Sequence, residues 1–266
     1  MQGRHRPHGA PRPGRPLVLL SAALLAWAPG SPPANAQTRT WVSLTFDDGL
    51  QDQYDNVRTL LDRHGMKATF FVSTGLLGRP GRMTRSEVMD LAASGHEIGG
   101  HTLDHLDLTD LPGGERHRQV CDDRTALRRM GLPARAFAYP FGAVDDDAAR
   151  TVRACGYRSA RGVGGIRAGT SCPRCGSAET VPPEDPYRTR TRDSITAGTR
   201  LGDLEDSVVQ AERHGGWLQL VFHHVCDGCG QRQAVTPRML AAFLSWLRHR
   251  TARGTGTATV TEVAER

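Results

Sequence analysis

The feature that most limits the fold of this 266-residue chain is a regular alternation of apolar, strand-like runs with amphipathic helical patterns. WVSLTF (41–46) precedes YDNVRTLLDRHG, and KATFFVST (67–74) precedes TRSEVMDLAASGH. The runs HEIGGHT and ARAFAYPFG are each followed by a helical pattern in the same way. Repetition of strand, turn and helix predicts βα units around a parallel sheet, which is an α/β fold. Periodicity alone does not decide whether such a sheet closes into a barrel.

The second half of the chain continues this pattern after one interruption. Residues 161–186 are rich in glycine, proline and cysteine and have no period, which predicts a long loop held by its cysteines. We therefore expect a single domain and no linker. The later segments are GYRSAR, YRTRTRDSI, a helix near 203–214, the strand GWLQLVFHH, the helix PRMLAAFLSWLRHR and a closing TATVTEV.

The first 36 residues have the three regions of a secretory signal peptide. Residues 1–16 carry four arginines and no acidic residue, LVLLSAALLAWA forms a short apolar stretch, and Ala34-Asn35-Ala36 fits a cleavage site. The alternative is a disordered arm before a short buried helix. We expect residues 1–36 to be removed, leaving a secreted, extracellular mature chain of residues 37–266.

Charge and hydropathy then exclude some classes of partner. Without the four arginines of residues 1–36, 30 basic residues face 28 acidic ones, a net charge of +2. This near balance gives no indication of a nucleic-acid partner. The mature chain has no second apolar run of membrane-spanning length, so we expect no membrane span in it.

Six cysteines in an exported chain favour disulfide bonds. Cys121 and Cys155 lie on successive helical patterns, and we expect them to pair. The other four form two C-x-x-C pairs, which favour disulfides but also permit a zinc ion held by four thiolates. These four are Cys172, Cys175, Cys226 and Cys229.

Two motifs at predicted strand ends suggest a metal site. Asp47 and Asp48 end the first strand, and the H-x-x-x-H motif of His101 and His105 begins where the third strand ends. Functional groups collect at the carboxyl ends of strands in α/β folds, and histidines four apart share one face of a helical turn. Two imidazoles and one carboxylate form a three-ligand set for a divalent cation, and the second carboxylate is then available as a base. The alternative is that the aspartates only cap a helix.

Two further motifs complete a resemblance to the polysaccharide deacetylase family, also called carbohydrate esterase family four, with its NodB homology domain. Thr45 to Gly49 reads T-F-D-D-G, and His101 to His105 reads H-T-x-x-H. Pro140-Phe141 resembles the third motif, and Val221-Phe222-His223 resembles the fifth. The resemblance extends from about residue 40 to about residue 263.

The resemblance implies a distorted (β/α) barrel, usually of seven strands, that hydrolyses N-acetyl or O-acetyl groups on carbohydrate. It implies one divalent metal; Zn²⁺ is expected, and Co²⁺, Ni²⁺ or Mn²⁺ fit the same ligands. It also implies a role for each matching residue. Asp48, His101 and His105 are the expected metal ligands, Asp47 the general base, His223 the general acid, and the backbone N–H of Phe141, after Pro140, a donor to the oxyanion.

The sequence departs from the family pattern at two places. Ala138 stands where many members have an arginine that contacts the base, and the fourth motif, which orients the acid histidine, has no clear match. We expect Arg190 or Arg192 to reach Asp47 instead, and Asp193 to serve the histidine. Successive strand residues point to opposite faces, so only one of His223 and His224 can be the acid. The motif register selects His223, and His224, with Phe222 as the apolar residue, is the alternative. We expect Asp52 to begin a helix or to lie behind a metal ligand.

Three alternatives to polysaccharide N-deacetylation remain open from the sequence. The same site suits ester-linked acetyl groups on xylan, or a non-sugar cyclic amide. The second alternative is a non-catalytic carbohydrate- or metal-binding protein that retains the barrel, and the absence of an arginine at position 138 favours it. In the third alternative, the four clustered cysteines hold the metal and the aspartates are helix caps.

Overall fold

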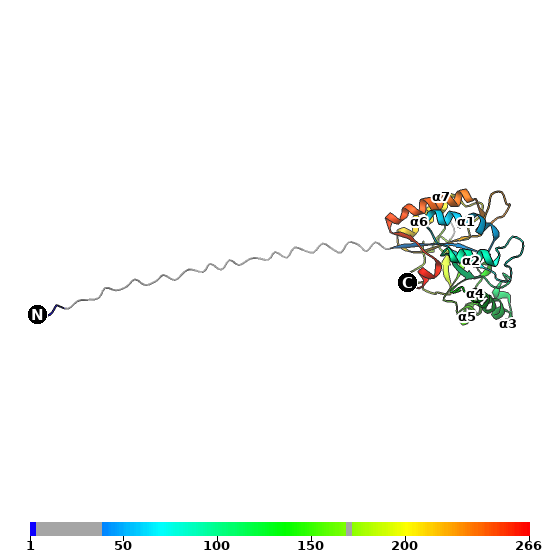
Figure 1. Cartoon of the computed structure of the whole chain (residues 1–266), viewed down its shortest axis with the longest axis horizontal. Helices are drawn as coiled ribbons and strands as arrows, with labels where there is room; N and C mark the ends of the chain where they lie inside the picture. Colours follow the sequence, from blue (N-terminus) through cyan, green and yellow to red (C-terminus); the bar gives the residue numbers. More distant parts are fainter. Residues whose placement is uncertain (4–38, 169–171) are drawn as a thin grey trace. The chain divides into compact units, whose positions relative to one another are not determined.

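The computed structural model describes residues 1–3, 39–168 and 172–266. The described part of residues 37–266 forms one compact unit, drawn as a ribbon in Figure 1. The expected signal peptide lies outside the described residues apart from its first three. Among the described helices, none is both long and apolar enough to cross a membrane.

A curved parallel sheet forms the centre of this unit. Its order is β7-β1-β2-β3-β4-β5-β6, and β10 adds to the first half of β1, where β2 does not pair. This is the expected distorted, seven-stranded (β/α) barrel. The strands are β1 (Thr40–Phe46), β2 (Thr69–Val72), β3 (Glu97–Gly100), β4 (Ala136–Ala138), β5 (Ser159–Gly165), β6 (Thr189–Thr191), β7 (Gly216–Phe222) and β10 (Thr255–Thr257), with β8 (His224–Val225) and β9 (Ala234–Val235) in a separate small sheet.

Individual hydrogen bonds bridge the seam between β6 and β7, where the described residues show no strand ladder. The side-chain amide of Gln219 donates to Thr189 Oγ1 at 2.9 Å, and the Ile195 N–H donates to the Val221 carbonyl at 3.0 Å. The barrel is therefore closed by a buried side chain and a loop at this point.

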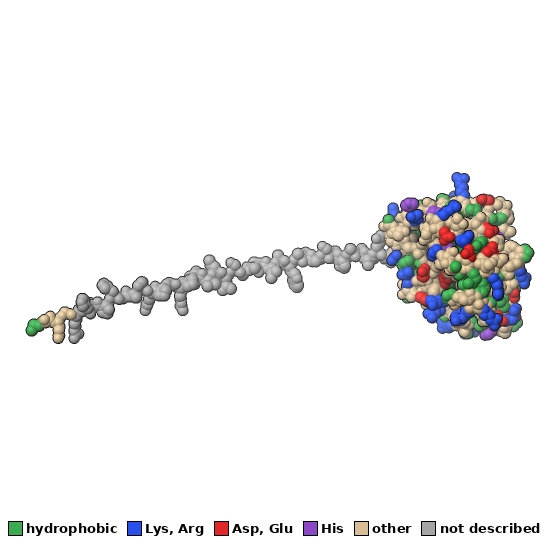
Figure 2. All heavy atoms as spheres, in the orientation of Figure 1, with side chains coloured by type: hydrophobic (Ala, Val, Ile, Leu, Met, Phe, Trp, Pro, Cys, Tyr) green, Lys and Arg blue, Asp and Glu red, His purple; other side chains and the backbone are tan. Residues whose placement is uncertain are grey.

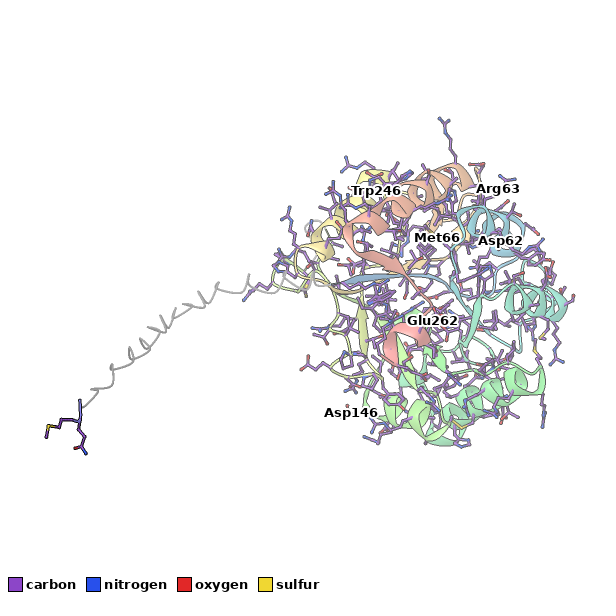
Figure 3. The ribbon with its side chains drawn as sticks, turned by 60° about the vertical axis from the view of Figure 1, so that its left-hand side comes forward. Asp62, Arg63, Met66, Asp146, Trp246 and Glu262 are labelled. Atoms are coloured by element: carbon purple, nitrogen blue, oxygen red, sulfur yellow. A yellow bond between two sulfur atoms is a disulfide. The ribbon has the colours of Figure 1, made fainter. Side chains whose placement is uncertain are left out.

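Helices cover the outside of the sheet. In Figure 1, α1, α6 and α7 lie in the upper part of the compact unit, α2 lies below α1, and α3, α4 and α5 lie in the lower part. Trp246, which is labelled in Figure 3, lies on α7. Its ring stacks on the ring of Phe243, with the ring centroids 6.0 Å apart. The helices are α1 (Gln51–His64), α2 (Arg85–Ala93), α3 (Gly113–His117), α4 (Asp123–Arg129), α5 (Asp146–Ala154), α6 (Leu201–Glu212), α7 (Pro237–His249) and α8 (Val260–Ala264), with short turns η1 (Leu108–Asp110), η2 (Arg118–Asp122), η3 (Pro140–Gly142) and η4 (Arg250–Arg253).

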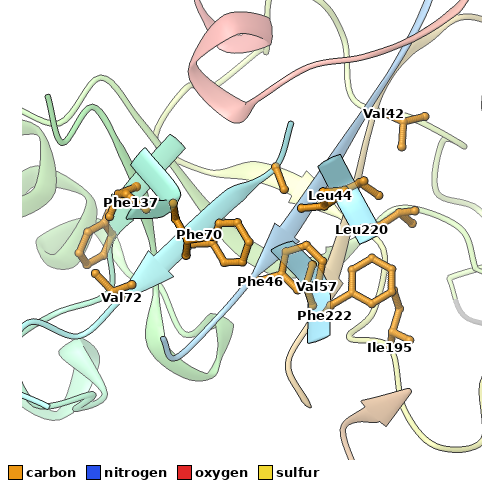
Figure 4. Close-up of a cluster of buried hydrophobic side chains, with 14 of the residues drawn as sticks. Val42, Leu44, Phe46, Val57, Phe70, Val72, Phe137, Ile195, Leu220 and Phe222 are labelled. Atoms are coloured by element: carbon orange, nitrogen blue, oxygen red, sulfur yellow. The ribbon is translucent and has the colours of Figure 1, made fainter. Parts of the chain in front are cut away.

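Strand β1 shows how the sequence divides the barrel into two environments. Its even-numbered apolar residues, such as Phe46, belong to the core shared with the helices, where Phe46 stacks between Phe70 and Phe222 at 5.1 and 5.2 Å (Figure 4). The residues between them, Ser43 and Thr45, are buried and hydrogen-bonded. Because strand side chains alternate between faces, the barrel interior next to β1 is polar.

The surface agrees with the small net charge of the mature chain. On the face of the compact unit shown in Figure 2, basic and acidic side chains lie interspersed. Such mixing leaves no large field of one sign on that face.

The closing segment TATVTEV is divided between two elements. Only its first residue, Thr257, belongs to β10 (Thr255–Thr257), which pairs with β1, and the chain then turns into the short helix α8. Thr259 and Glu262 form a reciprocal capping box at the start of α8, which explains why the apolar alternation does not continue as a strand.

The six cysteines form three disulfide bonds. Cys121 pairs with Cys155, as expected. Each C-x-x-C pair closes on itself, Cys172 with Cys175 and Cys226 with Cys229. The alternative of one zinc ion held by all four of these cysteines is therefore wrong.

A buried carboxyl group, that of Asp123, packs against the end of β3. Asp123 on α4 is fully buried and accepts hydrogen bonds from the Thr74 N–H at 3.1 Å, the Thr74 hydroxyl at 2.6 Å and the Tyr157 hydroxyl at 3.2 Å. A Cβ atom at Gly100 would overlap the Tyr157 hydroxyl and lie 2.7 Å from Asp123, so only glycine fits there. Burial raises the pKa of Asp123 to about 7, although the three hydrogen bonds oppose this rise.

Stability should therefore depend on pH through Asp123. The raised pKa means that the folded chain holds this proton more tightly than the unfolded chain, so the stabilisation is complete below the ordinary carboxyl pKa and is lost as pH rises through about 7. The total loss is about 4 kcal/mol. We expect Asp123→Asn, which keeps an acceptor for Thr74, to be more stable than the wild type above this range.

The measurement is the free energy of unfolding from denaturant titrations between about pH 4 and pH 9. Asp122→Asn removes an exposed neighbouring carboxylate and serves as the control. Parallel wild-type and Asp123→Asn curves across the range would contradict the role given to Asp123.

Candidate metal centre and active site

The carboxyl ends of four strands meet around a cavity of about 130 Å³. Asp47 and Asp48 follow β1, His101 and His105 follow β3, Phe141 follows β4, and His223 follows β7. The cavity is lined by these residues together with Tyr139, Gly142, Val163, Ser194 and Gln233. The sequence motifs, which lie up to 176 positions apart, are thus brought to one place.

Asp48, His101 and His105 form a compact set of possible metal ligands. Asp48 Oδ1 lies 3.0 Å from His105 Nε2 and 3.4 Å from His101 Nε2. The three ligand atoms all lie within 4.8 Å of one another. A carboxylate oxygen and two imidazole nitrogens at this spacing can face a single cation.

Two features of these side chains fit a bound divalent cation. The Nδ1 atom of His101 lies 2.7 Å from the Ala138 carbonyl, to which it donates its proton, so Nε2 keeps a lone pair toward Asp48. Asp48 Oδ1 is buried and has no hydrogen-bond partner within the described residues. A donor set of two nitrogens and one oxygen suits Zn²⁺, Co²⁺, Ni²⁺ or Mn²⁺.

Electrostatics keep Asp48 ionised. Burial raises the pKa of this carboxyl, but the adjacent imidazoles of His101 and His105 outweigh burial and hold the pKa well below its usual range. The residue is therefore a carboxylate, the form that a metal ion requires.

The loops that carry these side chains have unusual backbone conformations. Asp48, Thr102, His105 and Phe141 have φ angles of 78°, 67°, 58° and 59°. Non-glycine residues seldom adopt positive φ, and such residues cluster at functional sites. The expectation that His101 and His105 share a helical turn is wrong, because residues 101–105 form a loop in which two residues have positive φ.

The alternative that the aspartates only cap a helix is also wrong. Leu50, and neither aspartate, is the N-cap residue of α1, and that cap has no side-chain hydrogen bond.

Asp47 is neutralised by Arg161 of β5. Both side chains are buried, and Arg161 Nη2 pairs with Asp47 Oδ1 and also donates to Thr45 Oγ1 at 3.2 Å. Ala138 and Arg161 are direct neighbours in the register of β4 and β5. The guanidinium missing at position 138 is thus supplied from the adjacent strand.

The expected partners of Asp47 lie elsewhere. Arg190 is held by Glu179, with Nε 2.9 Å from Oε2, and Arg192 Nη1 lies 3.4 Å from the Asp203 carbonyl. The expectation that one of them reaches Asp47 is therefore wrong. Arg161 was missed because a lone arginine at the end of GYRSAR has no pattern that separates it from a solvent-exposed residue.

His223 lines the cavity, whereas His224 does not. Burial lowers the pKa of His223, and the charges of Asp47 and Asp48 oppose that change. Its Nδ1 atom is buried without a hydrogen-bond partner among the described residues, and Asp193 is exposed. The expected pair between Asp193 and His223 is therefore not formed.

Helix α1 holds the segment after β7 through three side chains. The Gln53 amide donates to the carbonyls of Asp47 and His223 at 2.5 and 3.1 Å. Asp52 accepts from His224 Nδ1 at 2.6 Å and from the Val225 N–H at 3.2 Å. Asn56 donates to the Val225 carbonyl at 2.7 Å.

The same contacts explain Asp52 and reveal a residue that the sequence interpretation missed. Asp52 lies in the first turn of α1, as one expectation had it, but it supports His224 and not a metal ligand. Gln53 joins the backbone of Asp47 to that of His223. Its place in the sequence, one residue after Asp52, does not indicate this role.

Comparison of folds places the molecule in a known class. A family 4 acetyl xylan esterase from Clostridium thermocellum, in complex with a cobalt ion, superposes with a TM-score of 0.57 at 21% identity, over 84% of this chain and 90% of that one. At this identity the likeness concerns the fold alone, which is that of the carbohydrate esterase and deacetylase barrels.

Sequence comparison relates residues 34–160 to a known family. Residues 34–160 match the model described as polysaccharide deacetylase. A chitooligosaccharide deacetylase of Sinorhizobium fredii is 33% identical over 114 residues, 41% of this chain and 51% of that protein. A peptidoglycan-N-acetylglucosamine deacetylase of Listeria monocytogenes is 32% identical over 120 residues, 44% of this chain and 25% of that protein. Residues 34–160 thus resemble the polysaccharide deacetylase family, and the chain spans about half or less of the length of these relatives.

The affinity for Zn²⁺ should distinguish the proposed metal ligands from neighbouring residues that do not bind the metal. We expect His101→Ala and Asp48→Asn to lose more affinity for Zn²⁺ than the roughly 10- to 100-fold that removal of an outer-shell partner costs. The measurement is competition with a chelating dye under oxidising conditions. His224→Ala is the matched control, because this histidine faces Asp52, and it should bind as the wild type does. Equal affinities of the wild type and His101→Ala would exclude the metal centre.

Proposed function

We propose that this protein is a metal-dependent hydrolase that removes N-acetyl or O-acetyl groups from a polysaccharide. The single observation that carries the proposal is the convergence of Asp47, Asp48, His101, His105 and His223 on one cavity at the carboxyl ends of the strands. The proposal includes residues 37–266 as one catalytic domain and residues 1–36 as a signal peptide for export.

Asp48, His101 and His105 would hold the divalent cation, for which Zn²⁺ is our first choice. When bound, such a cation acidifies water and withdraws charge from a carbonyl oxygen. Asp47 is the general base that takes the proton of the attacking water. Arg161 pairs with Asp47, and together with the hydrogen bond from Gln53 to the Asp47 backbone carbonyl it holds the carboxylate toward the cavity.

Phe141 and His223 serve the later part of the reaction. The positive φ of Phe141 turns its peptide at the cavity, where its N–H is the proposed donor to the developing oxyanion. His223 is the proposed general acid that protonates the leaving amine or alcohol.

The non-catalytic alternative has lost its main support. It rested on the missing arginine at Ala138, and Arg161 now supplies a guanidinium to the same aspartate from the neighbouring strand. The cavity is small and does not choose among glycans. Chitin-like oligomers, peptidoglycan, exopolysaccharide and acetylxylan all remain within the proposal, as does a non-sugar cyclic amide.

Acetate release tests the activity and the substrate class together. The mature chain, loaded with Zn²⁺, should release acetate from at least one of a panel of N-acetylated and O-acetylated glycans. Asp47→Asn should lower that rate by about 100-fold or more, because general-base catalysis contributes ~10²- to 10⁴-fold, while Zn²⁺ still binds. Metal-loaded protein that releases no acetate from any glycan would favour the non-catalytic alternative.

Because Ala138 on β4 and Arg161 on β5 are direct neighbours in the strand register, the arginine can be moved by mutation from β5 to β4. Arg161→Ala should destabilise the fold by about 3–5 kcal/mol, since it leaves the Asp47 carboxylate buried without a counter-charge. It should also lower kcat for acetate release. The double variant Ala138→Arg/Arg161→Ala should recover part of both losses.

The matched control for this transplant is Arg190→Ala, which removes the arginine held by Glu179 and should leave acetate release close to that of the wild type. If Arg161→Ala retained full activity, the role of Arg161 beside the base would be refuted. Unfolding and kcat are measured on the same preparations, so a folding defect is separated from a catalytic one.

A further inference from the structure

A second cluster of metal-binding side chains lies near the end of β7, outside the cavity. Asp52, His224 and Cys226 each offer one donor atom, and these atoms all lie within 4.8 Å of one another. His224 and Asp52 are already paired through Nδ1 and Oδ2 at 2.6 Å. None of these three residues lines the cavity that holds Asp48.

Cys229 adds a fourth donor to this cluster. It is the disulfide partner of Cys226, so its sulfur is bonded to one of the three donor atoms and can approach the other two once that bond is broken. In sequence the segment reads His224-Val-Cys226-Asp-Gly-Cys229, and a C-x-x-C spacing lets two thiolates bind one tetrahedral ion.

We propose that reduction of the Cys226–Cys229 disulfide creates a second metal site, in which Asp52, His224 and the two thiolates bind a thiophilic divalent cation such as Zn²⁺. Two thiolates, one imidazole and one carboxylate form a closed, four-ligand tetrahedral set. While the disulfide is intact, two of the four donors are absent, because the thiolate and not the disulfide sulfur is the metal ligand. The site is therefore controlled by the redox state of the chain.

The surroundings of the cluster allow both reduction and binding. Cys229 is exposed and Cys226 half-buried, so a thiol reagent can reach the bond. Gly228 and Gly230, which have positive φ angles of 61° and 71°, border a hollow of about 450 Å³ next to the disulfide. Asp52 and His224 retain about a quarter of their side-chain exposure, at 22% and 26%. The glycine-rich loop can thus adjust while the two residues from α1 and β8 stay fixed.

The reaction balances with a dithiol as the reductant. The dithiol transfers two electrons to the Cys226–Cys229 bond, which breaks to two thiols, and the dithiol itself becomes a disulfide. Each thiol then releases one proton when the cation binds.

Cobalt provides a readout that is specific for this site. Thiolate ligands give Co²⁺ an intense near-ultraviolet charge-transfer absorption, which the nitrogen and oxygen ligands of the Asp48 site do not give. Mature protein is reduced with dithiothreitol, freed of it by anaerobic gel filtration, and titrated with Co²⁺ beside untreated protein. We expect about two equivalents of Co²⁺ and thiolate absorption in reduced protein, and about one equivalent without that absorption in untreated protein.

The other disulfides supply matched controls. Cys172→Ser/Cys175→Ser removes the second C-x-x-C pair, and Cys121→Ser/Cys155→Ser removes a disulfide whose sulfurs lie near His117. Both variants should keep the thiolate absorption, whereas Cys226→Ser/Cys229→Ser should lose it. Asp52→Asn/His224→Gln keeps all the cysteines and should weaken Co²⁺ binding to the reduced protein by more than about 10-fold.

Two results would overturn the proposal. One is reduced protein that binds Co²⁺ without thiolate absorption. The other is thiolate absorption that survives in Cys226→Ser/Cys229→Ser, or that is as strong in Asp52→Asn/His224→Gln as in the wild type. Neither result affects the proposal of acetate release, because Co²⁺ binding at the Asp48 site is measured separately in the untreated protein.

Discussion

The buried ion pair between Asp47 and Arg161 is the interaction on which the interior of the barrel depends. Two charges without contact to water are costly unless each neutralises the other, and removal of either partner leaves an uncompensated charge. The pair also joins β1 to β5 across the inside of the barrel, where Thr45 accepts a further hydrogen bond from the same guanidinium. It explains how the chain ends a buried strand on two adjacent carboxylates: one is paired with an arginine, and the other lies between two imidazoles.

The rest of the site follows from what surrounds this pair. Positive φ angles at Asp48, His105 and Phe141 turn the loops so that their side chains and peptides face one cavity. Helix α1 then fixes the segment after β7, since Gln53, Asp52 and Asn56 bind consecutive groups of residues 223–225. As a result, the two histidines at the end of β7 point to different surroundings. His223 enters the cavity, and His224 joins Asp52 beside the Cys226–Cys229 disulfide.

Local patterns predicted the parallel sheet and its helices well and the side-chain partners poorly. The alternation of strand and helix, the motifs at strand ends and the Cys121–Cys155 bond are all present in the structure. The helical turn at His101 and the partners assigned to Asp47 are wrong. A helix or strand depends on residues that are neighbours in sequence, whereas Arg161 and Asp47 are 114 positions apart and meet only because β1 and β5 face the same interior.

The sequence by itself determined the fold class, the family resemblance and the candidate ligands, because hydrophobic periodicity and short motifs are local properties of the chain. Only the tertiary structure decided which arginine neutralises the base, which histidine lines the cavity, and that each C-x-x-C pair closes on itself. These outcomes depend on strand register and on the curvature of the sheet. Ala138 and Arg161 illustrate this dependence. Arg161 on β5 can replace an arginine that is missing at position 138 on β4 only because the two residues are direct neighbours in the strand register.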